Sequence, residues 1–338
     1  MSTTKRALAL GLAALLAAAT HLASAESPLR SLDGTRQWIN SPPLTSDQLR
    51  GKVVLVDFWT YSCINCLRTL PWLNAWAQKY GPQGLVVIGV HAPEFSFEKQ
   101  RDNVAKAVQR LKLTYPVAID TDFTAWRAFD THAWPTFHVV DGQGHVRHSQ
   151  VGESGYAQTE RVIQQLLMEA GATPMTGTTA APRDGLGLPP DDAHLRSPET
   201  YLGYAHGAAR GITPDRRQRY DGGEPRLNDW ALAGDWTVRA EHAELAAAGG
   251  GIVQRFHARD LHLVMGPAPD GKPLRFRITL DGQPPSADHG ADVDADGRGE
   301  IDGERLYQLV RQRGGVRERR FEIRFDAPGA RAYAFTFG

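Results

Sequence analysis

The sequence lacks cysteine almost entirely, since Cys63 and Cys66 are the only two among 338 residues. A disulfide-rich scaffold is excluded, because such folds need several cysteine pairs. A structural zinc site needs about four ligands, and no second cysteine or histidine pair stands at matching spacing. A purely structural disulfide is a weak alternative, because a bridge across so short a loop removes little unfolded-state entropy. The remaining reading is a dithiol that cycles between oxidised and reduced forms.

Net charge is also absent, because 38 basic side chains balance 38 acidic ones. This balance gives no sign of a nucleic-acid partner or an anionic membrane surface. The twelve histidines are scattered, so we expect neither a transition-metal site nor a cofactor. The hydrophobic fraction of 41% is enough for packed cores, and the length exceeds one ordinary domain. We therefore expect two domains.

Long hydrophobic runs are missing after the first residues. Lys5 and Arg6 precede an apolar run over 7–19, and 23–25 read Ala-Ser-Ala, a small-x-small cleavage pattern. The run is shorter than the ~20 residues that a spanning helix needs. We interpret 1–25 as a signal peptide cleaved near Ala25, which predicts export to a periplasm. An uncleaved anchor or a buried helix is the alternative.

The pattern of residues 26–170 predicts an α/β domain. Two continuous apolar runs, 53–58 and 85–90, are typical of buried strands. Between them, apolar side chains recur at the spacing of a helix, and such a strand–helix–strand unit favours parallel pairing of the two strands. The segment before them, 37–52, suggests a short hairpin and a turn of helix. The later pattern predicts a helix over 97–113, a strand over 117–120, a short helix over 122–129, a hairpin over 136–151 and a helix over 156–170.

Residues 171–197 are rich in Gly, Pro, Thr and Ala, which is typical of a linker. Beyond them, 198–338 show short apolar runs separated by turn residues. Residues 274–280, LRFRITL, and 320–325, RFEIRF, alternate cleanly between apolar and polar side chains. Such alternation predicts an antiparallel β-sandwich with a jelly-roll-like arrangement. The sandwich shows no catalytic constellation, so we expect it to bind or dock.

Placement favours redox chemistry at the cysteines. Cys63 falls at the predicted start of the helix after strand 53–58, where unpaired backbone amides and the helix dipole would stabilise a thiolate. Cys66 falls one turn inside, where it is less exposed. We therefore expect Cys63 to attack a substrate disulfide and Cys66 to resolve the mixed disulfide.

The stretch GKVVLVDFWTYSCINC resembles the active-site segment of thioredoxin-fold proteins. The resemblance implies that Asp57 is the buried acid that assists proton removal from the resolving thiol. Trp59 matches the tryptophan under the active site, and Pro71 matches the kink proline of the helix. By itself, an aspartate that ends a strand is also compatible with a simple turn or cap residue.

The dipeptide Trp134-Pro135 precedes the predicted strand 136–141 and resembles the cis-proline loop of the same family. The family uses that loop to hold a substrate strand by its backbone. The resemblance therefore implies that Pro135 is part of the catalytic site and that Trp59 and Trp134 contact the substrate.

The lead-in over 37–52 and the insertion after 85–90 resemble the redoxin or TlpA-like branch. The strings CINCLRTLP, VIGVHAPEF, SPETYLGY and LYQLVR are most similar to the soluble C-terminal region of DipZ-type proteins. There a thioredoxin-like domain precedes a carbohydrate-binding-module-like sandwich. The resemblance implies a thiol–disulfide oxidoreductase that acts on protein thiols and disulfides as a reductant. DipZ-type proteins carry a membrane electron-transfer domain on the same chain, and this sequence shows none, so we expect a separate membrane electron donor.

Two other functions stay open at this point. A thiol peroxidase is suggested by Thr60, three residues before Cys63, although Val56 replaces the proline of that pattern. A binding protein is the second, with the sandwich targeting a glycan or a protein. The aromatic residues that could stack on a sugar, or instead fill the sandwich core, are Tyr201, Tyr204, Trp230 and Trp236.

Two weaker signals concern acidic and histidine side chains. His91 and Glu94 follow the second buried strand and are either active-site neighbours or surface-loop residues. The segment 291–302 resembles a calcium loop, but Gly303 stands where an acidic ligand belongs, which favours a solvated acidic loop.

Overall fold

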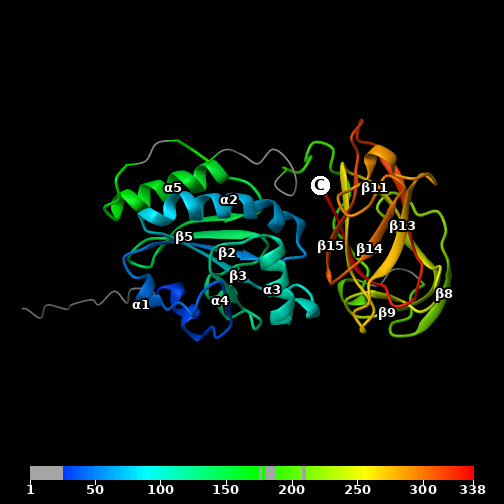
Figure 1. The fold of residues 1–338 in the computed structure, drawn as a ribbon, viewed down its shortest axis with the longest axis horizontal. Coiled ribbons are helices and arrows are strands. Elements are labelled where there is room, and N and C mark those ends of the chain that lie inside the picture. The colour runs from blue at the N-terminus through cyan, green and yellow to red at the C-terminus, as the bar shows by residue number, and fades with distance from the viewer. Residues whose placement is uncertain (1–25, 175–176, 180–187, 208–210) are drawn as a thin grey trace, which may run out of the picture.

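The structure is a computed structural model that describes residues 26–174, 177–179, 188–207 and 211–338. It contains an α/β domain followed by a large antiparallel β domain, and the two lie side by side (Figure 1). The predicted signal peptide and parts of the predicted linker lie outside the described residues. No helix in the described ranges is both long and apolar enough to span a bilayer.

The first domain is built on a six-stranded sheet with the order β1-β4-β3-β2-β5-β6. Strands β2, β3 and β4 are parallel, and the other three pair antiparallel. The bounds are β1 Trp38–Ile39, β2 Val53–Trp59, β3 Leu85–His91, β4 Val117–Ile119, β5 Thr136–Val140 and β6 Val146–Val151. Every residue of β2 is buried, as its continuous apolar run predicted.

Helices cover both faces of this sheet, with α2 and α5 on one side and α1 and α4 on the other (Figure 1). The side chains of β2 alternate accordingly: Val53 and Leu55 pack in the core with α2 and α5, and Val54 and Val56 pack with α4. The helices are α1 Ser46–Leu49, α2 Ile64–Tyr80, α3 Arg101–Arg110, α4 Thr124–Ala128 and α5 Tyr156–Glu169, with 3₁₀ turns η1 Pro28–Gly34, η2 Gly81–Gln83 and η3 Ser96–Lys99.

Two sequence predictions in this domain are wrong. The expected hairpin over 37–52 does not form, because β1 pairs with β4, far along the chain, and only the predicted helical turn appears as α1. The expected helix over 97–113 is interrupted. Glu98 accepts hydrogen bonds from the backbone amides of Glu94 and Phe95, which closes the separate turn η3. Gln100 then takes an extended conformation before α3 begins.

The second domain is an antiparallel sheet of eleven strands that curls over its own core, in agreement with the predicted sandwich. The strand β13 buries every second residue, as its alternating sequence predicted. The bounds are β7 Thr200–Tyr201, β8 Arg217–Asp221, β9 Trp230–Val238, β10 Ala243–Leu245, β11 Gly251–His257, β12 Asp260–Gly266, β13 Leu274–Leu280, β14 Arg298–Ile301, β15 Arg305–Arg311, β16 Glu318–Phe325 and β17 Arg331–Phe337, with 3₁₀ turns η5 Tyr204–His206 and η6 Ser286–Asp288.

The two domains pack on each other through apolar and charged contacts. The ring centroid of Tyr333 lies 5.2 Å from that of Phe95 and 4.8 Å from that of Phe97. The Nη2 atom of Arg68, on α2, lies 3.9 Å from Oδ2 of the buried Asp260, on β12. The C-terminal end of the chain lies on the side of the sandwich that faces the first domain (Figure 1). The second domain therefore reaches the helix that carries the cysteines.

Candidate active site

Cys63 is the N-cap residue of α2, which confirms the predicted helix start. Its backbone is extended, and its Sγ accepts a hydrogen bond from the Cys66 amide at 3.4 Å. That amide belongs to the first turn, whose N–H groups have no partner within the helix. Cys63 is partly exposed and Cys66 is fully buried, and both are free thiols. The more exposed of the two sulfurs is therefore also the one that lies at the helix start and accepts a hydrogen bond from its first turn.

Cys66 shares its buried surroundings with Asp57 of β2. Burial is the main cause that raises the pKa of the Cys66 thiol, and the neighbouring Cys63 and Asp57 raise it further. Burial also raises the pKa of Asp57 well above its usual range. Within the described residues, neither carboxyl oxygen of Asp57 has a hydrogen-bond partner. The raised pKa makes the Asp57 carboxylate a stronger proton acceptor than a solvated aspartate.

Glu98 lies under the loop that leads into Cys63 and is fully buried. Its Oε1 accepts hydrogen bonds from the Thr60 hydroxyl, the Ser62 hydroxyl and the Ser62 amide. Its Oε2 accepts from the amides of Glu94 and Phe95 at 2.7 and 3.0 Å. Burial raises the pKa of Glu98, while these donors act in the opposite direction. One carboxyl group thus ties the active-site loop to the insertion after β3.

Trp59 is fully buried and offers no surface to a substrate, so its predicted substrate contact is wrong. It packs edge-on against His91, with ring centroids 5.3 Å apart, and so supports the site from below. His91 is also fully buried, with Nε2 3.3 Å from the Thr60 hydroxyl oxygen. Burial lowers the pKa of His91 to about 3, which keeps the ring neutral. His91 is therefore an active-site neighbour and not a surface residue.

The Trp134–Pro135 peptide bond is cis. Thr136 pairs with Phe58 in the register of β5 and β2, so Pro135 stands at the sheet edge where β2 leads toward Cys63. The Pro135 carbonyl accepts a hydrogen bond from the Gly152 amide at 2.8 Å. Trp134 is partly exposed and packs against Trp126, with ring centroids 4.6 Å apart. The predicted loop therefore lies at the same end of the sheet as the cysteines.

A cleft of about 520 Å³ opens beside Cys63 between the two domains. Arg68, two residues after Cys66, lies almost fully buried at the base of this cleft. Its guanidinium group forms an ion pair with the Glu153 carboxylate at 2.9 Å. Burial raises the pKa of Glu153 to about 7 although Arg68 opposes the shift. The first domain contributes Cys63, Ile64, Asn65, Arg68, Gly152, Glu153 and Ser154, and the remaining wall is Pro189, Pro190, Asp192, Leu195, Ser197, Pro198, Glu199, Thr336 and Phe337.

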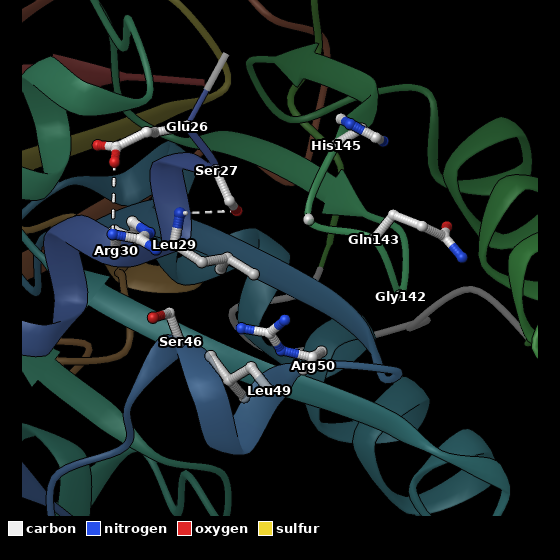
Figure 2. Close-up of a pocket in the computed structure, with 11 residues that line it drawn as sticks. Glu26, Ser27, Leu29, Arg30, Ser46, Leu49, Arg50, Gly142, Gln143 and His145 are labelled. Atoms are coloured by element: carbon white, nitrogen blue, oxygen red, sulfur yellow. Dashed lines mark hydrogen bonds and ion pairs between the residues drawn. The ribbon is translucent and has the colours of Figure 1, made fainter. Parts of the chain in front are cut away.

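Another cavity, of about 490 Å³, lies at the opposite end of the first domain (Figure 2). Figure 2 shows Arg50 and Leu49 on one side and Gln143 on the loop opposite. This cavity adjoins the start of β2, where the Gly51 amide donates a hydrogen bond to the Gly142 carbonyl. Cys63, in contrast, follows the opposite end of β2. It has no part in the chemistry of the cysteines.

The aromatic residues of the second domain do not form one shared platform. Trp236 is fully buried in the sandwich core, which rules out stacking on a sugar. Tyr201 donates a hydrogen bond to Glu94 and lies against Phe95, so it belongs to the domain contact. Of the four, Trp230 and Tyr201 line a cavity of about 950 Å³.

In the acidic loop 291–302, arginines hold the aspartates. Arg305 binds Asp292 at 2.8 Å, and Arg298 pairs with Asp294 and Asp296. The described residues contain no group of three or more histidine, cysteine, aspartate or glutamate side chains that could hold a metal ion.

Two site residues, Glu98 and Arg68, were not predicted from the sequence. Glu98 lies at the start of the segment expected to be a helix, and the only local sign of burial is that it directly follows Phe97. Arg68 was visible only as part of the string CINCLRTLP. Its partner Asp260 is far away in the sequence, so no local pattern links the two.

Comparison with known proteins supports both domains. The AhpC/TSA family model matches residues 36–149, and the model of a thioredoxin-like C-terminal domain matches residues 197–338. Protein DipZ of Mycobacterium bovis is 37% identical over 274 residues, which cover 73% of this chain and 37% of that protein. The chain thus spans little more than a third of the DipZ length.

Two shorter proteins match the first domain. Thiol-disulfide oxidoreductase YkuV of Bacillus subtilis is 32% identical over 143 residues, which cover 42% of this chain and 95% of that protein. The solution structure of a thioredoxin-like protein in the oxidized form is 30% identical, with a TM-score of 0.39, over 42% of this chain and 96% of that one. Since YkuV is more than 30% identical and is covered almost in full, the chain belongs to the thioredoxin-fold thiol–disulfide oxidoreductases.

Proposed function

We propose that this enzyme is an exported reductant of protein disulfides that acts through the Cys63-Ile64-Asn65-Cys66 dithiol. The observation that carries the proposal is the asymmetry of the two thiols. Cys63 is partly exposed and caps a helix, while Cys66 is buried beside a buried acid. An attacking thiol needs access and a stabilised anion, and a resolving thiol needs protection from solvent.

The reaction starts from the reduced enzyme. The Cys63 thiolate attacks one sulfur of the substrate disulfide, that S–S bond breaks, and the second substrate sulfur leaves as a thiolate that takes a proton. Asp57 then accepts the proton of the Cys66 thiol, and the Cys66 sulfur attacks Cys63. The Cys63–Cys66 disulfide forms as the mixed disulfide breaks. Two electrons pass from the enzyme dithiol to the substrate, which leaves as a dithiol.

Pro135 would orient the substrate in this scheme. It stands at the sheet edge from which the active-site loop emerges, and its carbonyl is held by Gly152. Trp134 remains a candidate for substrate contact because part of its surface is exposed. Trp59 and His91 lie below the site and support the loop.

We also propose that a separate membrane protein returns electrons to the Cys63–Cys66 disulfide in the periplasm. The basic start and the short apolar run of residues 1–25 support export. We propose that the enzyme domain spans 26–170, the linker 171–197 and the sandwich 198–338.

Thiol peroxidase activity is disfavoured by the position of the Thr60 hydroxyl. This hydroxyl donates its hydrogen bond to Glu98 and so is not available to Cys63.

The exchange reaction is tested by reducing insulin with wild-type enzyme, Cys63→Ser and Cys66→Ala. Wild type should turn over, Cys63→Ser should be inactive, and Cys66→Ala should accumulate a mixed disulfide on Cys63 that mass spectrometry detects. Full turnover by Cys63→Ser would refute the assignment.

A further inference from the structure

We propose that the cleft between the domains binds an extended segment of the substrate protein in which lysine or arginine flanks the disulfide. This inference rests on the proposed function, because it takes Cys63 as the sulfur that meets the substrate. It adds a role for the second domain, which forms one wall of the substrate site.

The position of the cleft is the first argument. Cys63 lines it together with Ser197 and Phe337, so a disulfide that reaches Cys63 from this side must lie between the domains. The volume of about 520 Å³ is in the range of ligand-binding sites in proteins. Apolar residues on both walls, among them Ile64 and Leu195, suit the aliphatic stems of lysine and arginine.

The charges of the cleft are the second argument. Among the described residues that line it, the single cation is Arg68, which is buried and already faces Glu153 and Asp260. The exposed carboxylates of Asp192 and Glu199 also line the cleft, and neither forms an ion pair with any of the described residues. The surface that meets a substrate beside Cys63 is thus acidic, although the whole chain carries no net charge. A local preference for basic segments follows, with no contribution from the overall charge.

Thr336 is the third argument. It lines the cleft, it is 5% exposed, and its hydroxyl has no hydrogen-bond partner. Its neighbours Phe335 and Phe337 point into the sandwich core, so strand alternation directs Thr336 toward the first domain. A buried hydroxyl without a partner is costly unless a ligand uses it. The backbone of an extended peptide supplies both a donor and an acceptor for it.

The test uses short cyclic peptides with one disulfide flanked by lysine, by serine or by glutamate. Reduced wild-type enzyme should reduce the lysine peptide about fivefold faster than the glutamate peptide at low salt, and the ratio should shrink as salt rises. The double variant D192N/E199Q should bring this ratio close to one. The control D270N/E300Q removes the same charge from exposed sites outside the cleft and should keep the wild-type ratio.

Binding separates this inference from the proposed function. Peptides whose cysteines are replaced by serine are titrated onto the Cys63→Ser protein, in which no exchange occurs. Tighter binding of the lysine form, lost in D192N/E199Q and weakened for all three peptides by Thr336→Val, supports the cleft even if turnover fails. Equal binding of the three peptides, or the same loss in D270N/E300Q, overturns the inference and leaves disulfide exchange intact.

Discussion

Replacing Glu98 by glutamine should weaken both the fold and the chemistry, although the two side chains have nearly the same shape. The carboxylate accepts five hydrogen bonds, three on Oε1 and two on Oε2. An amide has only one acceptor oxygen, so its NH₂ group must face donors on one side. The orientation of lower energy lets the glutamine oxygen accept hydrogen bonds from the backbone amides of Glu94 and Phe95. The hydroxyls of Thr60 and Ser62 then turn to accept, and the Ser62 amide loses its partner.

The magnitude follows from these bonds. One buried N–H without a partner costs roughly 1–3 kcal/mol, and each bond that changes from a charged to a neutral acceptor loses about 1 kcal/mol. The neutral amide regains part of this loss, because burial opposes the ionised form of Glu98. We expect a net loss of about 2 kcal/mol in the free energy of unfolding. Since residues 60–62 lead into Cys63, the rate of disulfide exchange should fall on the order of tenfold.

Urea unfolding and stopped-flow reduction of a small disulfide measure the two effects. Glu300→Gln is the matched control, because Glu300 is exposed on β14, and it should change stability by no more than about 0.5 kcal/mol. An E98Q protein as stable and as fast as this control would refute the role assigned to Glu98.

Three further predictions concern groups around the site. Asp57→Asn should slow resolution of the mixed disulfide about a hundredfold at neutral pH, with a smaller deficit at high pH, where Cys66 ionises unaided; quenched-flow trapping measures the step. Burial raises the pKa of Glu94 to about 8, so wild type should lose stability as pH rises from about 4.5 through about 8, and Glu94→Gln should lose less over the same range; urea unfolding of both proteins checks the sign. Arg68→Met should cost about 3 kcal/mol of stability by calorimetry, because it leaves the largely buried carboxylate of Glu153 without its cation, whereas Asp260 keeps Arg259 and Arg311; an unchanged melting temperature would contradict this.

The sequence predicted those parts of the fold that depend on local pattern. The continuous apolar run of β2 and the alternation in β13 each reflect the number of faces that a strand buries, so both strands were predicted. Strand β8, Arg217–Asp221, was missed because it is an edge strand with polar residues and leaves no apolar pattern. The cysteine spacing likewise located the helix start, since capping is a local property.

The parts of the site that arise from distant contacts were not predictable. Glu98 became a buried acceptor only because the insertion after β3 folds beneath Thr60 and Ser62. Arg68 found Asp260 only because the sandwich packs against α2. In both cases a charged side chain is buried, and a single sequence gives no sign of the partner that satisfies it.

Competitive alkylation of the reduced enzyme tests the central claim most directly. Iodoacetamide in limiting amount is added over a series of pH values, and mass spectrometry locates the label on Cys63 or Cys66. If the helix start stabilises the partly exposed thiolate and burial keeps its neighbour protonated, the label should appear on Cys63 at neutral pH. Cys66 should react only after the protein unfolds. Equal labelling of the two thiols in the folded enzyme, or labelling of Cys66 first, would contradict the account.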